Sequence, residues 1–144
     1  MRSTIPASDP TPSTVAGTPP AAADPRFAGI DRLYGAGTVA RLAGKHVAVV
    51  GLGGVGSWAA EALVRSGVGR LTLIDADDLC VSNTNRQLHA LDGEYGRAKV
   101  EVLAERFRRI NPALDVRAVA DFVTPANLAA RLDGGLDLVV DAFD

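Results

Sequence analysis

The chain has 144 residues, of which 47% are hydrophobic and 22% charged, and a formal net charge of -2. This is the composition of one globular domain. The overall charge argues neither for nor against nucleic acid, since a strongly basic body is absent and a local basic patch is not excluded. DNA is not among the expected partners. A single cysteine, Cys80, excludes an internal disulfide framework and a cysteine-rich zinc site, and it suits the reducing cytoplasm. No apolar run approaches the roughly 18 residues that a membrane-spanning helix needs, so this segment indicates no membrane partner.

The first 25 residues differ in composition from the rest. They carry six of the eight prolines, together with many Ala, Ser and Thr residues. Such a segment cannot bury enough apolar surface to offset the entropy of ordering it, so we expect residues 1–25 to form a disordered tail. The apolar residues between Ile30 and Leu42 are spaced as one or two short helices before the first strand.

From His46 onward, strand and helix patterns alternate. The strands are expected at residues 47–50, 71–75, 116–121 and 136–143. Helices are expected at 57–66, at 100–110 and, in a short form, after a cap at Thr124 with Pro125 in the first turn. This alternation predicts an α/β fold, a Rossmann-like, doubly wound and mostly parallel sheet with the fourth strand beside the first. Such domains normally continue with further strands, so we expect the chain to be part of a longer protein.

A glycine-rich motif, GLGGVG at residues 51–56, follows the first strand and opens the next helix. Glycines there allow a tight turn, let the backbone approach a phosphate and let helix and strand pack closely. The helix N-terminus adds free N–H groups that favour an anion. Asp75, at the end of the second strand, can accept hydrogen bonds from a ribose. The motif predicts a nucleotide site without distinguishing NAD, FAD and ATP.

The next loop favours ATP. Residues 75–87 are rich in polar side chains and include Arg86, and Lys99 begins the following helix. In the predicted topology Arg86, Lys99 and Asp144 all lie at the same sheet edge as the glycine turn. Cations for developing charge and a carboxylate for Mg²⁺ are the components of phosphoryl or nucleotidyl transfer, and hydride transfer needs none of them.

The separated motifs GxGGxG, DxD, NxxRQ, a lysine in the next helix and DxxD after an apolar strand resemble the ubiquitin-activating-enzyme-like superfamily. That superfamily includes the bacterial sulfur-carrier adenylyltransferases of molybdopterin and thiamine synthesis. Within it, RFAGIDRLYG, GVGSWAAEALVRSGVG, NTNRQLHAL and DFVTPANL are most similar to the tRNA threonylcarbamoyladenosine dehydratases. The resemblance implies that residues 26–144 are the N-terminal part of a ThiF-like ATP-binding adenylation domain.

The resemblance also implies roles for individual residues. Asp75 would bind the ribose, Asn83 would contact the phosphates, and Arg86 and Lys99 would act on the phosphates during transfer. Asp144 would hold Mg²⁺, with Asp141 as the competing carboxylate. An arginine of the partner subunit would complete the catalytic set, Arg32 being the first candidate and Arg26 the second. The implied ATP-binding set is Gly51, Gly53, Gly54, Gly56, Asp75, Asp77, Ser82, Asn83, Asn85, Arg86 and Lys99.

The activity implied by the resemblance is the ATP-dependent cyclisation of threonylcarbamoyladenosine in tRNA through an acyl-adenylate. The implied partners are this tRNA, a second copy of the chain in a homodimer, and a sulfur-transfer (cysteine desulfurase) system. One alternative is an adenylyltransferase that activates the C-terminal glycine of a ubiquitin-like sulfur carrier. A further alternative is an NAD(P)-binding module without catalysis.

Several other residues are given structural interpretations. Cys80 is expected to be a small buried residue and Trp58 to belong to the core. His46 and His89 are isolated in the sequence, and no function is expected of them. A set of arginines on the predicted helices and strands could contact tRNA phosphates. This set is Arg65, Arg70, Arg106, Arg108 and Arg109.

Overall fold

The computed structural model describes residues 24–143. Residues 1–23 of the predicted tail and the predicted metal ligand Asp144 therefore lie outside the described residues. The described chain begins with a short 3-10 helix, η1 (Pro25–Phe27), at whose start the Asp24 side chain accepts a hydrogen bond from the Arg26 N–H. Two short helices follow, α1 (Ala28–Tyr34) and α2 (Thr38–Ala43), as the sequence predicted.

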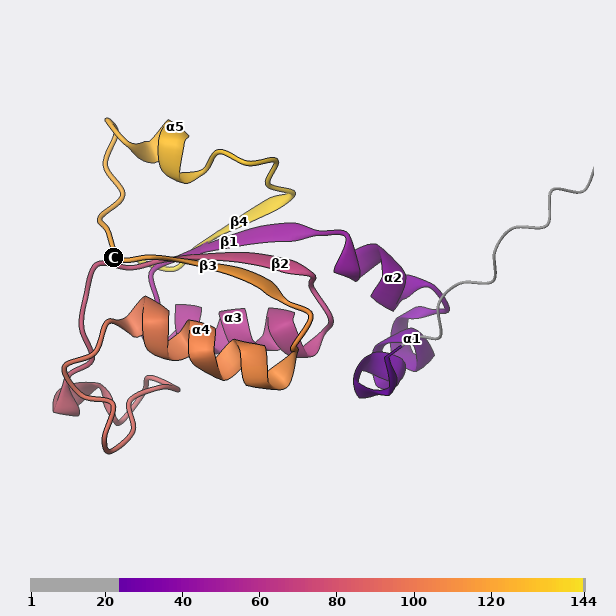
Figure 1. The fold of residues 1–144 in the computed structure, drawn as a ribbon, viewed down its shortest axis with the longest axis horizontal. Coiled ribbons are helices and arrows are strands. Elements are labelled where there is room, and N and C mark those ends of the chain that lie inside the picture. The colour runs from indigo at the N-terminus through magenta and orange to yellow at the C-terminus, as the bar shows by residue number, and fades with distance from the viewer. Residues whose placement is uncertain (1–23, 144) are drawn as a thin grey trace, which may run out of the picture.

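A four-stranded parallel sheet forms the centre of the fold (Figure 1). Its strands are β1 (His46–Val50), β2 (Arg70–Ile74), β3 (Asp115–Val119) and β4 (Leu138–Asp141). They lie in the order β3-β2-β1-β4, so the predicted Rossmann-like architecture and the pairing of the first and fourth strands are confirmed. β2 and β3 are added on one side of β1, and β4 is added on the other side. Ligands of such sheets bind at this topological switch point, outside the carboxyl ends of the strands.

The main hydrophobic core lies on one face of the sheet. Helices α3 (Gly56–Arg65) and α4 (Lys99–Ile110) cover that face, and Figure 1 shows them side by side below the strands. Their buried residues Val64, Leu103 and Phe107 pack in one cluster with Leu71 and Leu73 of β2. A smaller cluster lies at the carboxyl ends of the strands. None of the described helices has the length and apolarity that crossing a bilayer requires.

The short helix after β3, α5 (Leu128–Arg131), begins three residues after Pro125, one turn later than predicted. Thr124 nevertheless makes the contacts of a helix cap: the Asn127 N–H donates to Thr124 Oγ1 at 3.3 Å, and the Thr124 N–H donates to Asn127 Oδ1 at 2.8 Å. The Leu128 N–H donates to the Thr124 carbonyl at 2.9 Å, so residues 124–128 form a helical turn that leads into α5. Asn127 also donates its side-chain amide to the Phe122 carbonyl at 2.8 Å. The predicted cap at Thr124 is therefore confirmed, and only the start of the regular helix differs.

Two burial predictions were wrong. Cys80 is exposed, because its neighbour Leu79, 2% exposed, occupies the core position of that turn. Trp58 is 55% exposed, because the buried face of α3 is formed one position away, starting from Ser57. The Trp58 indole N–H donates to the Arg86 carbonyl at 3.0 Å, so this side chain connects α3 to the loop after β2.

Candidate nucleotide-binding site

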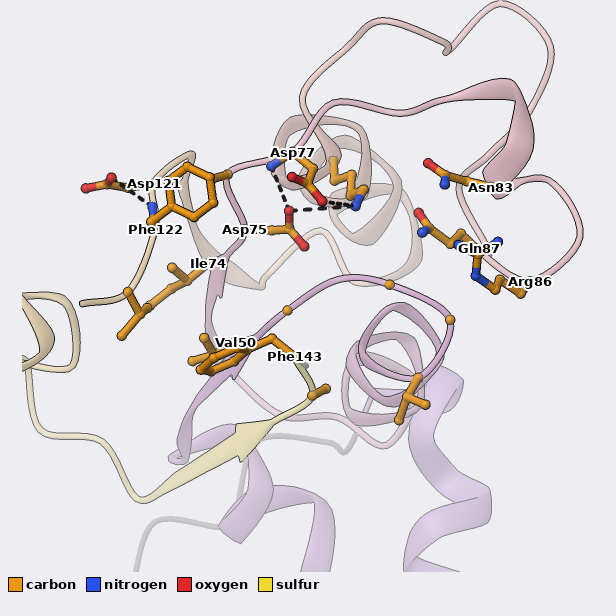
Figure 2. A pocket seen from close by; sticks show the side chains of 18 residues that line it. Val50, Ile74, Asp75, Asp77, Asn83, Arg86, Gln87, Asp121, Phe122 and Phe143 are labelled. Carbon is orange, nitrogen blue, oxygen red and sulfur yellow. Dashed lines mark hydrogen bonds and ion pairs between the residues drawn. The ribbon is translucent and has the colours of Figure 1, made fainter. Parts of the chain in front are cut away.

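A cavity of about 760 Å³ opens at the carboxyl ends of the strands, where the sequence placed the site (Figure 2). This volume lies in the range of small-molecule sites. Figure 2 shows an apolar part around Ile74, Phe122 and Phe143, and a polar part around Asn83 and Arg86. The cavity thus offers both an apolar surface and a group of polar side chains. Its lining includes Gly51, Gly53, Gly54, Asp75, Asp77, Asn83, Arg86, Gln87 and Lys99.

The glycine turn needs its glycines for packing as well as for access. Gly51 has a φ of 86°, and a Cβ there would lie 2.7 Å from the Ala142 carbonyl oxygen. A Cβ on Gly56 would overlap the Gly51 carbonyl group, so Gly56 lets α3 start directly against the turn. Gly56 does not line the cavity, whereas Gly53 and Gly54 do. At Gly54 an added Cβ would meet the aliphatic part of Arg86, with 3.2 Å to Cγ.

Asp75 holds the glycine turn against the end of β2. Its Oδ2 accepts the Leu52 N–H at 2.6 Å and its Oδ1 accepts the Asp77 N–H at 2.8 Å. The carboxylate is 9% exposed and lines the cavity. Asp75 therefore positions the loops on both sides of the site, and its contact with a ribose stays a prediction.

Lys99 is a buried cation. Its side chain is 7% exposed, and Nζ lies 2.7 Å from Asp77 Oδ2 and 3.9 Å from Asp75 Oδ1. The Lys99 N–H also donates to the Asp77 carbonyl at 3.1 Å, which fixes the start of α4 against the loop after β2. A buried ammonium is unfavourable unless it is paired. Lys99 is therefore not a solvent-exposed surface lysine, and its ammonium group provides a fixed positive charge at the cavity.

Arg86 lies at the polar part of the cavity, and its neighbours hold it there. Its guanidinium donates to the Ser82 carbonyl at 3.1 Å and to Asn85 Oδ1 at 2.9 Å. Ser82 and Asn85 were predicted to line the nucleotide, but the structure leaves both outside the cavity lining, where they orient Arg86. Asn83 does line the cavity, and its Oδ1 accepts the Cys80 N–H at 2.9 Å.

Other predicted site residues lie away from the cavity. Figure 1 places α1, which carries Arg32, beyond the amino ends of the strands, at the edge opposite the site, and Arg26 precedes α1 in the chain. Neither arginine lines the cavity of its own chain. Asp141 is exposed at the end of β4 and is not part of the lining either.

The carboxylates that line the cavity are already paired. Asp75 and Asp77 face Lys99, and Asp121 pairs with Arg131. Among residues 24–143 no group of three or more His, Cys, Asp or Glu side chains could hold a metal ion. A Mg²⁺ ion held mainly by phosphate oxygens with one protein carboxylate needs no such cluster.

Most of the arginines suggested for tRNA contacts are paired within the fold. Glu61, 7% exposed on α3, accepts hydrogen bonds from Arg65 at 2.7 Å and from Arg106 at 2.5 Å. Burial alone would raise the pKa of Glu61, but these hydrogen bonds lower it. Arg70 pairs with Asp115, and Arg108 donates to the Val116 carbonyl. These contacts tie α3, α4 and β3 together.

Several cavity residues belong to the motifs of the sequence analysis without having been given a role there, Gln87 and Phe122 among them. Gln87 is 6% exposed and completes the NxxRQ motif. Phe122 is 69% exposed and belongs to DFVTPANL. The signal for both was present in the motifs, but a loop glutamine and a loop phenylalanine are ordinary residues until the fold brings them to the same cavity.

The two histidines are buried in different ways. The His46 ring contacts Thr72 Oγ1 at 2.9 Å and the Gly134 carbonyl at 3.2 Å, so it is satisfied within the fold. His89 is 1% exposed, and neither ring nitrogen has a hydrogen-bond partner among the described residues. Burial lowers the pKa of His89 to about 4, and the charges of Lys99 and Arg106 act in the same direction.

His89 should make stability depend on pH. The unfolded chain takes up this proton near the ordinary value of 6.5, and the folded chain only near 4, so stability falls as the pH drops between these values. The expected loss is about 2 kcal/mol between pH 7 and pH 5. Urea unfolding at both pH values checks this, with His89→Gln as the control. The variant should lose less stability than the wild type, and an equal loss in both proteins would show the prediction to be wrong.

Comparison with known proteins agrees with the motif pattern. Residues 28–144 match the model of the ThiF family. The tRNA threonylcarbamoyladenosine dehydratase of Escherichia coli (strain K12) is 57% identical over 119 residues, which cover 83% of this chain and 44% of that protein. The molybdopterin-synthase adenylyltransferase of the same organism is more distant, at 41% identity over 99 residues, covering 69% of this chain and 39% of that protein.

A solved structure supports the same relationship. The crystal structure of the E. coli tRNA N6-threonylcarbamoyladenosine dehydratase TcdA in complex with ATP superposes with a TM-score of 0.81 at 57% identity, and the match covers 83% of this chain and 49% of that one. The chain therefore spans less than half the length of these relatives. Motifs, fold and comparisons together show that the chain belongs to the ThiF family.

Proposed function

We propose that this chain is the nucleotide-binding part of an enzyme that uses ATP to dehydrate threonylcarbamoyladenosine in tRNA to its cyclic form. The observation that carries the proposal is the cavity itself, in which a glycine turn, the buried Lys99 and the oriented Arg86 meet. Support also comes from the 57% identical relative, which is named as such a dehydratase and whose structure is named as an ATP complex.

ATP fits the two parts of the cavity. The apolar part, around Ile74 and Phe122, suits a purine ring, and the turn at Gly53 and Gly54 lets phosphate oxygens approach the backbone. Asp75, which lies between the two parts, would accept a hydrogen bond from the ribose in addition to those it accepts from the backbone. Mg²⁺ would be held by the phosphates and, in this proposal, by Asp144, and it would screen their negative charge.

The proposed reaction has two steps. A carboxylate oxygen of the threonylcarbamoyl group attacks the α-phosphorus, the bond to the β-phosphate oxygen breaks, and pyrophosphate leaves. A nucleophile of the same group then attacks the activated carbonyl, the group releases one proton to solvent, and AMP leaves with the former carboxylate oxygen. Lys99 and Arg86 stabilise the charge that builds on the α-phosphate. The second step benefits from proximity, since nucleophile and electrophile belong to one group.

The proposal extends to the assembly of the enzyme. We propose a homodimer in which Arg32, or alternatively Arg26, reaches the partner's site, because α1 lies at the edge opposite its own cavity. A sulfur-transfer partner and a cytoplasmic location are likewise proposed from the family resemblance.

The sulfur-carrier adenylyltransferase stays the second candidate for the function, supported by the 41% identical relative. An NAD(P)-binding module without catalysis is disfavoured, because the 57% identical relative is named as a dehydratase and its structure as an ATP complex.

ATP turnover by the full-length protein tests the proposal. AMP and pyrophosphate are measured with three added substrates: tRNA that bears threonylcarbamoyladenosine, the same tRNA without the modification, and a ubiquitin-like carrier protein that ends in glycine. The proposal predicts AMP formation only with the modified tRNA. Adenylation of the carrier alone would contradict it and favour the second candidate.

A further inference from the structure

Trp58 is a large aromatic side chain on the first turn of α3, and most of its ring lies outside the core. It is 55% exposed, whereas the neighbouring Ser57 is fully buried. The Trp58 indole N–H nevertheless has a defined partner, the Arg86 carbonyl at 3.0 Å. Ser57 makes a second contact from the same turn, because its Oγ accepts the Leu88 N–H at 3.4 Å. The start of α3 therefore bonds the main chain of the loop after β2 at two points.

The bond from Trp58 differs from the other hydrogen bonds of Arg86. The Arg86 N–H donates to the Asn83 carbonyl at 3.1 Å. Its guanidinium donates to the Ser82 carbonyl and to Asn85 Oδ1. These partners belong to the same loop, so the bonds shape the loop itself. Within residues 24–143, the bond from Trp58 is the one hydrogen bond that joins Arg86 to a different element.

The position of Arg86 relative to the glycine turn matters for the proposed chemistry. A Cβ built on Gly54 would lie 3.2 Å from Arg86 Cγ and 3.3 Å from Cδ, so the aliphatic stem passes directly over the turn. The guanidinium therefore extends from beside the backbone that phosphates approach. A small displacement of a catalytic group lowers the rate strongly, even when the changed residue lies away from the chemistry.

We propose that Trp58 is a positioning residue: its indole N–H fixes the main chain of Arg86 against α3 and so holds the guanidinium at the phosphates. Trp58 is not part of the cavity lining, so it acts through Arg86 and makes no contact with ATP. The inference rests on the proposed function, because it needs Arg86 to act on the phosphates. It adds to that function a residue outside the cavity that controls the rate.

The test is a double-mutant cycle on the full-length protein, with single-turnover AMP formation on the modified tRNA as the measurement. Trp58→Phe keeps an aromatic ring and removes the N–H donor. It should lower the rate about twofold to tenfold, the factor that corresponds to one neutral hydrogen bond. The same substitution in the Arg86→Gln background should leave the rate unchanged, because the group that Trp58 positions is gone. A residue with a purely structural role would lower the rate equally in both backgrounds.

The outcomes separate the inference from the proposed function. An unchanged rate of Trp58→Phe, or an equal loss in both backgrounds, would overturn the inference and leave the proposed function intact. A higher KM for the tRNA at unchanged kcat would also overturn it, because Trp58 would then contact the tRNA. A wild-type protein that forms no AMP with the modified tRNA would overturn the proposed function and the inference with it.

A second replacement covers the case in which Trp58→Phe does not fold. Benzothienylalanine at position 58 keeps the size and the two fused rings of tryptophan and carries sulfur in place of the N–H. It should give the same loss of rate, again only when Arg86 is present. A wild-type rate with this side chain would overturn the inference, since the N–H would then be dispensable.

Discussion

Replacing Lys99 with methionine is expected to lower kcat for AMP formation by about 100-fold to 1,000-fold, the effect of removing one preorganised electrostatic contact from a transition state. The Lys99 ammonium is buried beside the cavity and is paired with Asp77 at 2.7 Å. Charge builds on the α-phosphate as the carboxylate attacks, and a fixed cation stabilises that charge more than it stabilises the bound substrate. Single-turnover AMP formation with the modified tRNA measures the effect.

Two further variants separate charge from structure. Lys99→Arg keeps the positive charge and should retain more activity than Lys99→Met. Asp77→Asn removes the closest partner of the ammonium and leaves Lys99 in place, so it should reduce activity much less. The Asp77 side chain is 62% exposed, so water can solvate it when Lys99 is replaced, and the Lys99→Met fold should persist. If Lys99→Met turned over within about threefold of the wild type, the proposed role of this cation in the transition state would be refuted.

Replacing Gly56 with alanine is expected to destabilise the fold by about 4 kcal/mol or more, the range of the largest single-residue effects. The added Cβ would overlap the Gly51 carbonyl group, whose carbon would lie at 2.9 Å, and it would also approach the Ala142 Cβ at 3.2 Å. These atoms belong to the glycine turn and to the end of the sheet, so α3 would have to move away from both. Urea unfolding followed by circular dichroism measures the loss.

Gly53→Ala is the matched control for Gly56→Ala. It lies in the same turn, but the nearest atom to its added Cβ is Gln87 Nε2 at 3.9 Å, an ordinary contact distance. Gly53→Ala should therefore fold normally and weaken ATP binding, because the new methyl group lies where phosphate oxygens approach. Equal stability of Gly56→Ala and the wild type would show that the close packing of α3 on the turn is not needed.

Much of the fold could be predicted because its signals are local. Parallel strands are buried on both faces, so β1 and β2 appear as short apolar runs, and helix α4 shows its buried positions at regular spacing. The cap at Thr124 is a local signal and could be predicted, whereas the start of the regular helix α5 one turn later could not. The exposure of Trp58 could not be predicted, because it depends on which face of α3 is turned toward the core. The small residues of this helix do not distinguish a face that starts at Ser57 from one that starts at Trp58.

The site was predictable in its members more than in their contacts. Gly54, Arg86 and Lys99 were identified from spacing, topology and motif resemblance, and the structure brings all three to one cavity. That Lys99 is paired with Asp77, and that Asp75 holds the glycine turn, required the three-dimensional arrangement of three loops. Contacts between side chains that are distant in sequence depend on how the elements pack, and the spacing of motifs along the chain does not predict them.

The mass of the modified nucleoside tests the central claim most directly. The full-length protein is incubated with tRNA that bears threonylcarbamoyladenosine, with and without ATP, and the nucleosides are then analysed by mass spectrometry. We predict that the modified adenosine loses the mass of one water only when ATP is present, and that AMP accumulates in equal amount. An unchanged nucleoside mass in the presence of ATP, with the protein folded and ATP bound, would contradict the proposed activity.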